Sequence, residues 1–115
     1  MQFLMTVTIG QHAGAPPPEL QAAMTKLVDD ETRAGTFVIT GSPAAHTDGA
    51  CLRVSKAGLV RSAPLLPIYG YAVVECPALE QAMDVASRVL RLHQELVPDW
   101  EVECDVRQIV THCLP

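Results

Sequence analysis

The sequence predicts a single α+β domain that spans residues 1–115. Hydrophobic residues make up 49% of the chain and charged residues 18%, which is typical of a folded domain and not of a disordered segment or a coiled coil. The spacing of the hydrophobic residues changes along the chain between a period of two, typical of strands, and a period of 3.6, typical of helices. A chain of this length buries enough surface for one core.

The first half of the chain is predicted to form a strand, a helix and a second strand. Residues 2–9 alternate and place four apolar side chains on one face: Phe3, Met5, Val7 and Ile9. A helix is expected from Glu19, and Gly35 is placed to end it. Its apolar stripe contains Leu20, Ala23, Met24, Leu27 and Val28. Residues 36–40 are rich in β-branched side chains and predict the second strand.

The middle of the chain predicts a hairpin and a longer strand. Residues 50–55 alternate as a strand, and the turn residues 56–58 join them to a partner strand over 59–62. Residues 68–76 form the next predicted strand, which places Tyr69 and Tyr71 on one face.

The last part of the chain predicts a second helix and a final strand. Pro77 opens the helix and Pro98 ends it by about Val97. Its apolar stripe contains Leu79, Ala82, Met83, Ala86, Val89, Leu90 and His93. Residues 100–109 alternate strictly, so Trp100, Val102, Cys104, Val106 and Gln108 are expected to share one face.

This order of elements is a split βαβ pattern, the ferredoxin-like arrangement with an extra hairpin. Helices of that fold cover one face of the sheet only, and the second face here is mixed in character, with Leu4, Thr6 and Thr8 on the first strand. A homodimer that packs two sheets face to face, a dimeric α+β barrel, would cover the second face and leave a cleft in each subunit.

Charge, cysteine spacing and missing motifs exclude several classes of protein. The net charge is −5 and the eight basic residues are scattered singly, which argues against nucleic-acid binding and against an anionic membrane surface. No secretory signal or membrane helix is expected, so the predicted location is cytoplasmic, with the four cysteines as buried thiols. Nucleotide, flavin and classical hydrolase motifs are absent, and we expect neither a metal nor a cofactor.

Four stretches of this layout resemble the YCII-related family, also called the DGPF-domain family. They are the first strand at 1–5, the helix exit at 31–35, the Gly70-Tyr71 strand start with its apolar continuation to Glu75, and the ending at 100–108. The resemblance spans nearly the whole chain. It implies a dimeric α+β barrel of ferredoxin-like subunits and a range of functions, from small enzymes of aromatic-compound breakdown to accessory proteins without an assigned reaction.

Two functional residues of that family do not carry over. The Asp-Gly-Pro-Phe motif would fall at residues 62–65, where only Pro64 matches and the acidic residue is missing. Relatives also carry a histidine on the first helix, and this helix has none. The His–Asp acid/base pair that the resemblance implies is therefore absent at those positions.

The candidate acid/base pair of this chain is His46 with Asp48, on a loop rich in small residues. A carboxylate beside an imidazole orients the ring and raises its pKa, which is the usual arrangement for proton transfer. Catalytic groups are often found on loops of a rigid scaffold. The alternative is a solvated loop with no chemical role.

The candidate substrate-binding residues are Tyr69, Tyr71, Arg61, Ser62 and Arg107. The tyrosines would line a pocket for an apolar or aromatic ligand, or else pack at a dimer interface. Arg61 and Ser62, which stand where the family's acidic motif would be, suit an anionic or carbonyl group. Arg107 shares a predicted face with Glu75 and Glu103, either to hold an acidic substrate or to form a solvated ion pair. His93, on the apolar stripe, is expected to be a satisfied histidine near the core.

The sequence therefore predicts a homodimeric, cofactor-free enzyme that acts on a small apolar or aromatic metabolite by proton transfer, as a lyase, cyclase or isomerase. A non-catalytic ligand-binding or accessory protein is the first alternative, since the family's acid and histidine are missing. A cofactor-free monooxygenase is the second alternative, because that class also uses dimeric α+β barrels.

Overall fold

A computed structural model describes residues 1–10, 13–43, 48–64 and 68–110 of the chain and has an α+β fold. The described residues form two helices and six strands. In chain order they are β1 (Gln2–Ile9), α1 (Pro18–Arg33), β2 (Phe37–Gly41), β3 (Cys51–Ser55), β4 (Gly58–Ser62), β5 (Ile68–Glu75), α2 (Leu79–Leu96) and β6 (Val102–Gln108). The predicted order of elements is confirmed, with boundaries that differ by one or two residues.

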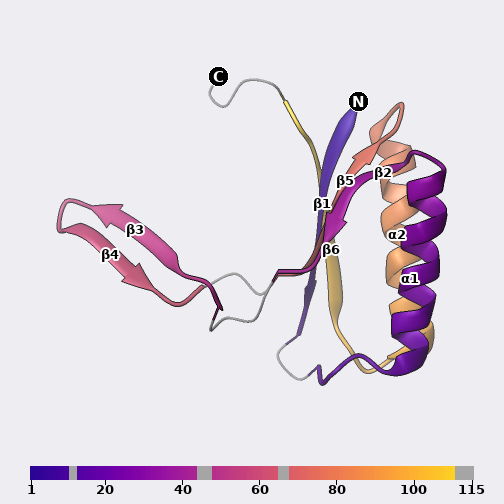
Figure 1. Cartoon of the computed structure of the whole chain (residues 1–115), viewed down its shortest axis with the longest axis horizontal. Coiled ribbons are helices and arrows are strands. Elements are labelled where there is room, and N and C mark those ends of the chain that lie inside the picture. The colour runs from indigo at the N-terminus through magenta and orange to yellow at the C-terminus, as the bar shows by residue number, and fades with distance from the viewer. Residues whose placement is uncertain (11–12, 44–47, 65–67, 111–115) are drawn as a thin grey trace.

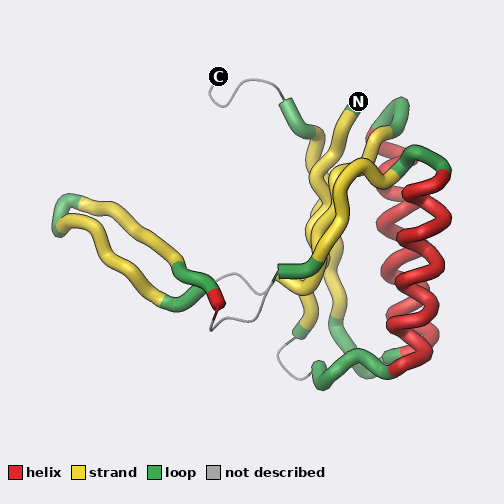
Figure 2. The backbone as a smooth tube through the Cα atoms, in the orientation of Figure 1, coloured by secondary structure: helices red, strands yellow, loops and turns green. Residues whose placement is uncertain are grey.

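Four of the strands form one antiparallel sheet in the order β2-β5-β1-β6. Both helices lie side by side on the same side of this sheet (Figure 1). The opposite side, called the open face below, is covered by neither of these two helices (Figure 2). The chain therefore builds two layers, with the core between helices and sheet.

Alternation along β1 separates the core from the open face. Phe3, Met5 and Val7 are buried beneath the helices, whereas Leu4 is exposed and Thr6 half-buried on the other side. The partner strand β6 follows the same period, since Val7 lies opposite Cys104 and Met5 opposite Val106. The faces predicted for β1 and β6 are confirmed.

Helix α1 begins at Pro18, a residue that suits a first helical turn because its missing N–H would have no partner there. Two residues past its last residue, Gly35 adopts a φ of 80°, which only glycine tolerates readily, and the chain turns into β2. Leu20 is fully buried, and Met24, Leu27 and Val28 pack against the core. The predicted stripe of this helix is confirmed.

The predicted stripe of helix α2 is wrong at one edge. Val85 is buried, together with Ala82, Ala86, Val89 and His93, whereas Leu79 and Met83 are exposed. At 3.6 residues per turn, Leu79 and Met83 lie roughly 60–100° from the centre of the buried stripe, outside the strip that a single neighbouring layer can cover. The apolar period located the helix correctly, but it placed the centre of the buried face too close to Leu79 and Met83.

Strands β3 and β4 form a separate two-stranded hairpin, called the arm below. It projects from the open-face side of the sheet, away from the helices (Figure 1). None of its residues belongs to the core of the described structure. The radius of gyration is 16.0 Å, compared with about 13 Å for a compact chain of this length, because the arm stands apart from the body.

Candidate functional site

A pocket of about 610 Å³ opens between helix α1 and the sheet. Its apolar walls come from both helices and from three strands, and polar side chains are few. The residues that line it are Met5, Val7, Pro16, Met24, Thr25, Val28, Asp29, Phe37, Thr40, Gly41, Ser42, Pro43, Ile68, Tyr69, Gly70, Tyr71, Ala72, Val89 and His93. A concave, largely apolar site with a few polar groups is typical of small-molecule binding.

His93 is the buried polar group of this pocket. Its residue surface is 1% exposed, and its Nδ1 lies 2.8 Å from the carbonyl oxygen of Val89, one helical turn earlier. A carbonyl oxygen only accepts, so Nδ1 carries the proton and donates it. The other ring nitrogen, Nε2, finds no hydrogen-bond partner among the described residues. The predicted place of His93 near the core is confirmed, and the described residues give a hydrogen-bond partner to one of its two ring nitrogens.

Tyr69 lies beside His93 on the helix side of the sheet. The two rings meet edge to face, with centroids 6.0 Å apart and planes at 84°. Burial raises the pKa of the Tyr69 hydroxyl, because the charged form is poorly solvated there. Tyr69 therefore remains a neutral phenol through the physiological range.

Tyr69 and Tyr71 do not share a face, contrary to the prediction. Val7 pairs with Gly70, but its neighbour Thr8 pairs with Ile68, so Tyr69 is an extra residue in a β-bulge. The bulge turns Tyr69 toward the helices, while Tyr71 stays opposite Thr6 and faces away from them. Both tyrosines still line the pocket, which reaches round the end of β2.

Gly41, the last residue of β2, lets Tyr71 lie close to the backbone. A Cβ at position 41 would stand 2.6 Å from the Tyr71 hydroxyl oxygen, closer than side chains tolerate. The small residue therefore positions the Tyr71 ring at the mouth of the pocket.

The structure describes one member of the loop pair proposed from the sequence. His46 lies outside the described residues, and Asp48 is exposed and does not line the pocket. Arg61 and Ser62 lie on the arm, where both are exposed and Ser62 donates a hydrogen bond to the carbonyl of Ala63 at 3.1 Å. These positions do not meet the two tyrosines within this chain.

Arg107 lies on the open face, as predicted, in the same layer as Glu75 and Glu103. Its guanidinium donates two hydrogen bonds to Asp105, of 2.8 and 3.2 Å, and these raise the pKa of Arg107. This is the solvated ion pair that was the alternative to substrate binding, and a pair this exposed contributes little to stability.

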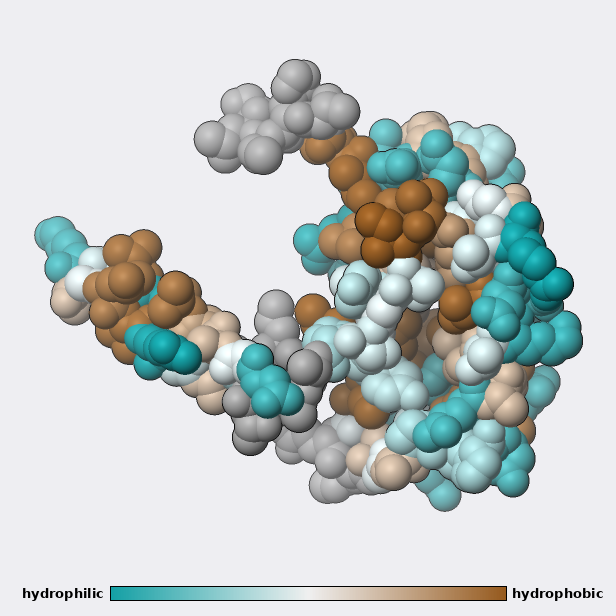
Figure 3. Space-filling model, in the orientation of Figure 1, coloured by the Kyte–Doolittle hydropathy of each residue, from teal (hydrophilic) through white to brown (hydrophobic). Residues whose placement is uncertain are grey.

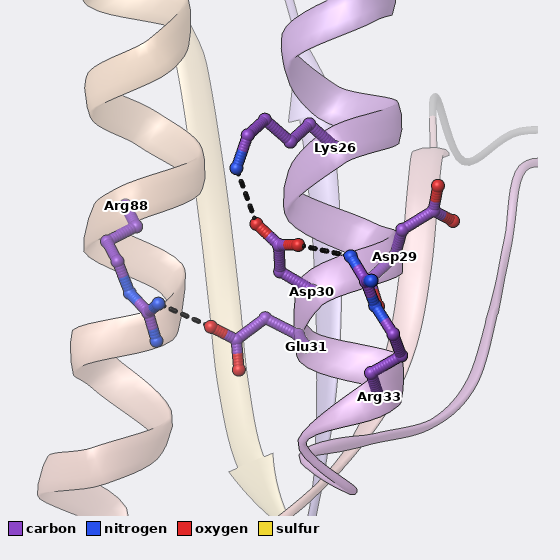
Figure 4. Close-up of polar contacts among 6 residues, drawn as sticks. All are labelled: Lys26, Asp29, Asp30, Glu31, Arg33 and Arg88. Carbon is purple, nitrogen blue, oxygen red and sulfur yellow. Dashed lines mark hydrogen bonds and ion pairs between the residues drawn. The ribbon is translucent and has the colours of Figure 1, made fainter.

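The helix layer carries a second set of charges, in the groove between α1 and α2 (Figure 4). Asp30 accepts hydrogen bonds from Lys26 at 2.8 Å and from Arg33 at 2.7 Å, and the hydrogen bond from Lys26 is the main reason that the pKa of Asp30 is lowered. Glu31 is buried and pairs across the groove with Arg88 of α2. These charged groups therefore satisfy one another.

A metal site finds no support in the part of the chain that the structure describes. No three His, Cys, Asp or Glu side chains there gather closely enough to hold a metal ion. Cys104 is half-buried on β6, where burial raises its pKa to about 11, so its thiol is a poor nucleophile. Neither described helix has the length and apolarity that crossing a membrane requires.

No family model and no curated protein matches the chain. Among solved structures, the de novo designed protein Foldit4 is similar at 12% sequence identity and a TM-score of 0.49, over 96% of this chain and 100% of that chain.

Proposed function

We propose that this chain binds a small, mainly apolar or aromatic metabolite in the pocket between α1 and the sheet, and that His93 accepts a proton from it. The observation that supports the proposal is the Nε2 atom of His93, which is buried and lacks a partner among the described residues, on a residue that lines the pocket. A buried polar atom without a partner costs about 1–3 kcal/mol, a cost that a ligand with a hydrogen-bond donor would remove.

The fixed tautomer of His93 suits proton transfer. Because Nδ1 donates to the carbonyl of Val89, the ring is held in one orientation and the lone pair lies on Nε2. An imidazole that is oriented through one nitrogen and free at the other is the usual form of a histidine general base. The reaction would be of the lyase, cyclase or isomerase type, with Tyr69 beside the ligand as a neutral hydroxyl.

One observation favours a non-catalytic binding protein as the second candidate. Asp29 is the only carboxylate among the described residues that line the pocket, and it is exposed on α1. A catalytic histidine is commonly oriented by a carboxylate, whereas here a backbone carbonyl holds the ring. The same His93 would then act as a hydrogen-bond acceptor that selects the ligand.

The subunit arrangement proposed with this function is a ferredoxin-like homodimer of the YCII-related type. The strand order β2-β5-β1-β6, with two helices on one side, supports the ferredoxin-like part. The exposed side chains of Leu4, Ile39 and Tyr71 on the open side of the sheet support a covering subunit there.

A pair of probe ligands tests the role of His93 in binding. Indole has a ring N–H, and indene has nearly the same shape without it. Because Nε2 accepts one hydrogen bond, we expect the wild-type chain to bind indole about five- to tenfold more tightly than indene in calorimetric titrations. In a His93→Leu variant this preference should vanish.

Thr25→Val is the matched control, since it removes a different polar group from the same pocket and should leave the preference unchanged. Equal binding of the two probes by the wild type, or a preference that survives His93→Leu, would show that Nε2 does not contact the ligand. Failure of both probes to bind at millimolar concentration would contradict the pocket itself.

A further inference from the structure

We propose that the arm docks on the open face of a second copy of this chain, with its apolar side seated in a groove along β1 and β6. The inference rests on the homodimer proposed above and goes further, because it names the segment and the surface that meet. Three observations support it: the arm has one apolar face, the open face has a groove, and the arm and the groove differ in charge.

The two faces of the arm differ in character. Val54 pairs with Leu59 and Leu52 with Arg61, so these four side chains lie on one face, called the apolar side of the arm. Leu52, Val54 and Leu59 are 65%, 76% and 70% exposed. The other face carries Cys51, Arg53, Ser55, Val60 and Ser62. An amphipathic hairpin that leaves three large aliphatic side chains in water is unexplained within one chain.

The space-filling view shows these apolar side chains gathered along the arm and standing clear of the body (Figure 3). An isolated two-stranded hairpin is marginally stable in water, so the arm needs a surface to pack against. Its own chain does not supply one, since no arm residue joins the core of the described structure.

A groove of about 750 Å³ follows β1 and β6 on the open face, and it also includes Leu90, Val102 and Cys104 from the helix side of the β6 edge. Its floor is formed by Thr6 and Thr8, which are half-buried, and by Leu4 and Ile68. Its charged wall belongs to β6, and contains Glu103, Asp105 and Arg107. The groove is long enough in the strand direction to span β1 from Leu4 to Thr8, about 13 Å at the usual rise per residue, which matches the five-residue strands of the arm.

The charges of the two surfaces are complementary. Residues 51–62 contain three of the eight basic residues and no acidic one, so the arm carries +3 and the rest of the chain −8. Arg61 stands on the apolar side of the arm, without a carboxylate partner among the described residues. In the groove, Glu103 makes no ion pair with any described residue. A basic arm and an acidic groove attract each other, whereas contacts between two arms or between two grooves would bring like charges together.

A second copy is the occupant that these features favour. The arm projects from the open-face side of the chain (Figure 1), and the groove follows β1 and β6 on that face, so a two-fold axis between two copies would use each contact twice. The same side of the chain would then bury the arm, the groove and the exposed Tyr71 together.

Sedimentation velocity on the full chain tests this proposal with neighbouring substitutions. Leu59 and Val60 follow each other on β4 and point to opposite faces. We expect a dimer for the wild type, a dimer dissociation constant at least a hundredfold weaker for Leu59→Glu, and a change of less than threefold for Val60→Glu. On the groove side, Leu4→Glu should dissociate the dimer, whereas Met83→Glu on the outer surface of α2 should not.

Each outcome bears on a different part of the proposal. A monomeric wild type would overturn both the homodimer and the arm contact. A dimer that survives Leu59→Glu but not Leu4→Glu would overturn the arm contact and keep the homodimer. Equal loss with Leu59→Glu and Val60→Glu would overturn the assignment of the apolar side. Far-UV circular dichroism and cooperative melting establish that each variant is folded, and the indole titrations test the pocket separately.

Discussion

Phe3→Ala is expected to lower the free energy of unfolding by about 3–5 kcal/mol, which corresponds to a fall in melting temperature of roughly 10–20 °C. Phe3 is 1% exposed in the middle of the sheet, and it is one of the largest side chains of the core. With aromatic residues only 4% of the chain, the neighbouring small aliphatic side chains cannot fill the cavity that its loss would leave. Urea-induced unfolding, followed by circular dichroism, measures the change.

Met83→Ala is the control for this prediction. Both residues were predicted to be buried from hydrophobic spacing, but Met83 is 52% exposed on α2. Its truncation should therefore cost less than about 1 kcal/mol. Similar losses for the two variants would mean that α2 buries the face predicted from the sequence and that its orientation here is wrong.

Arg88→Met is expected to lower the free energy of unfolding by about 2 kcal/mol. The substitution leaves the buried carboxylate of Glu31 without its partner. Breaking a fully buried pair costs about 3–5 kcal/mol, and the smaller value applies here because half of the Arg88 side chain is in contact with solvent. Adding Glu31→Gln to the Arg88→Met variant should recover most of the loss, since a neutral amide is easier to bury.

Arg33→Met is the matched control for Arg88. It removes an arginine that is also ion-paired on the helix layer, but the partner, Asp30, is exposed and keeps its hydrogen bond from Lys26. The expected change in unfolding free energy is below about 0.5 kcal/mol. If Arg33→Met proved as damaging as Arg88→Met, burial of Glu31 would not be the cause of the loss.

The sequence predicted the helices and strands well, because the spacing of apolar residues follows the local geometry of the backbone: a period of two in a strand and of 3.6 in a helix. The alternation of Phe3, Met5 and Val7 placed the first strand and its buried face correctly, and the period through Leu20 located α1. The stripe of α2 failed at Met83, because which side of an apolar helix is covered depends on how the helix sits on the sheet.

Two features of the site depended on contacts that local patterns do not encode. The bulge at Tyr69 adds one residue to β5 and reverses the face of that side chain, and nothing in the spacing of Tyr69 and Tyr71 marks it. The hairpin was predicted from its turn residues, but no local pattern indicates that it projects from the body instead of joining the core of the described residues.

Sequence reasoning placed the acid/base chemistry on His46 and Asp48 and assigned His93 to the core. One signal could have pointed to His93. It lies one turn after Val89 in an otherwise aliphatic stripe, where the backbone carbonyl can satisfy only one of the two ring nitrogens. The second nitrogen then needs another partner, and the chain supplies none among its described residues.

The central claim is that His93 presents an unprotonated Nε2 to the pocket, and its tautomer can be measured directly. Two-bond proton–nitrogen correlation spectra of the ¹⁵N-labelled chain at neutral pH distinguish the two neutral forms of an imidazole, and the His93→Leu spectrum identifies the signal among the four histidines. We expect the form protonated at Nδ1, with an Nε2 signal that shifts when indole binds and stays unchanged with indene. A His93 protonated at Nε2, or one whose signal is unaffected by indole, would contradict the account.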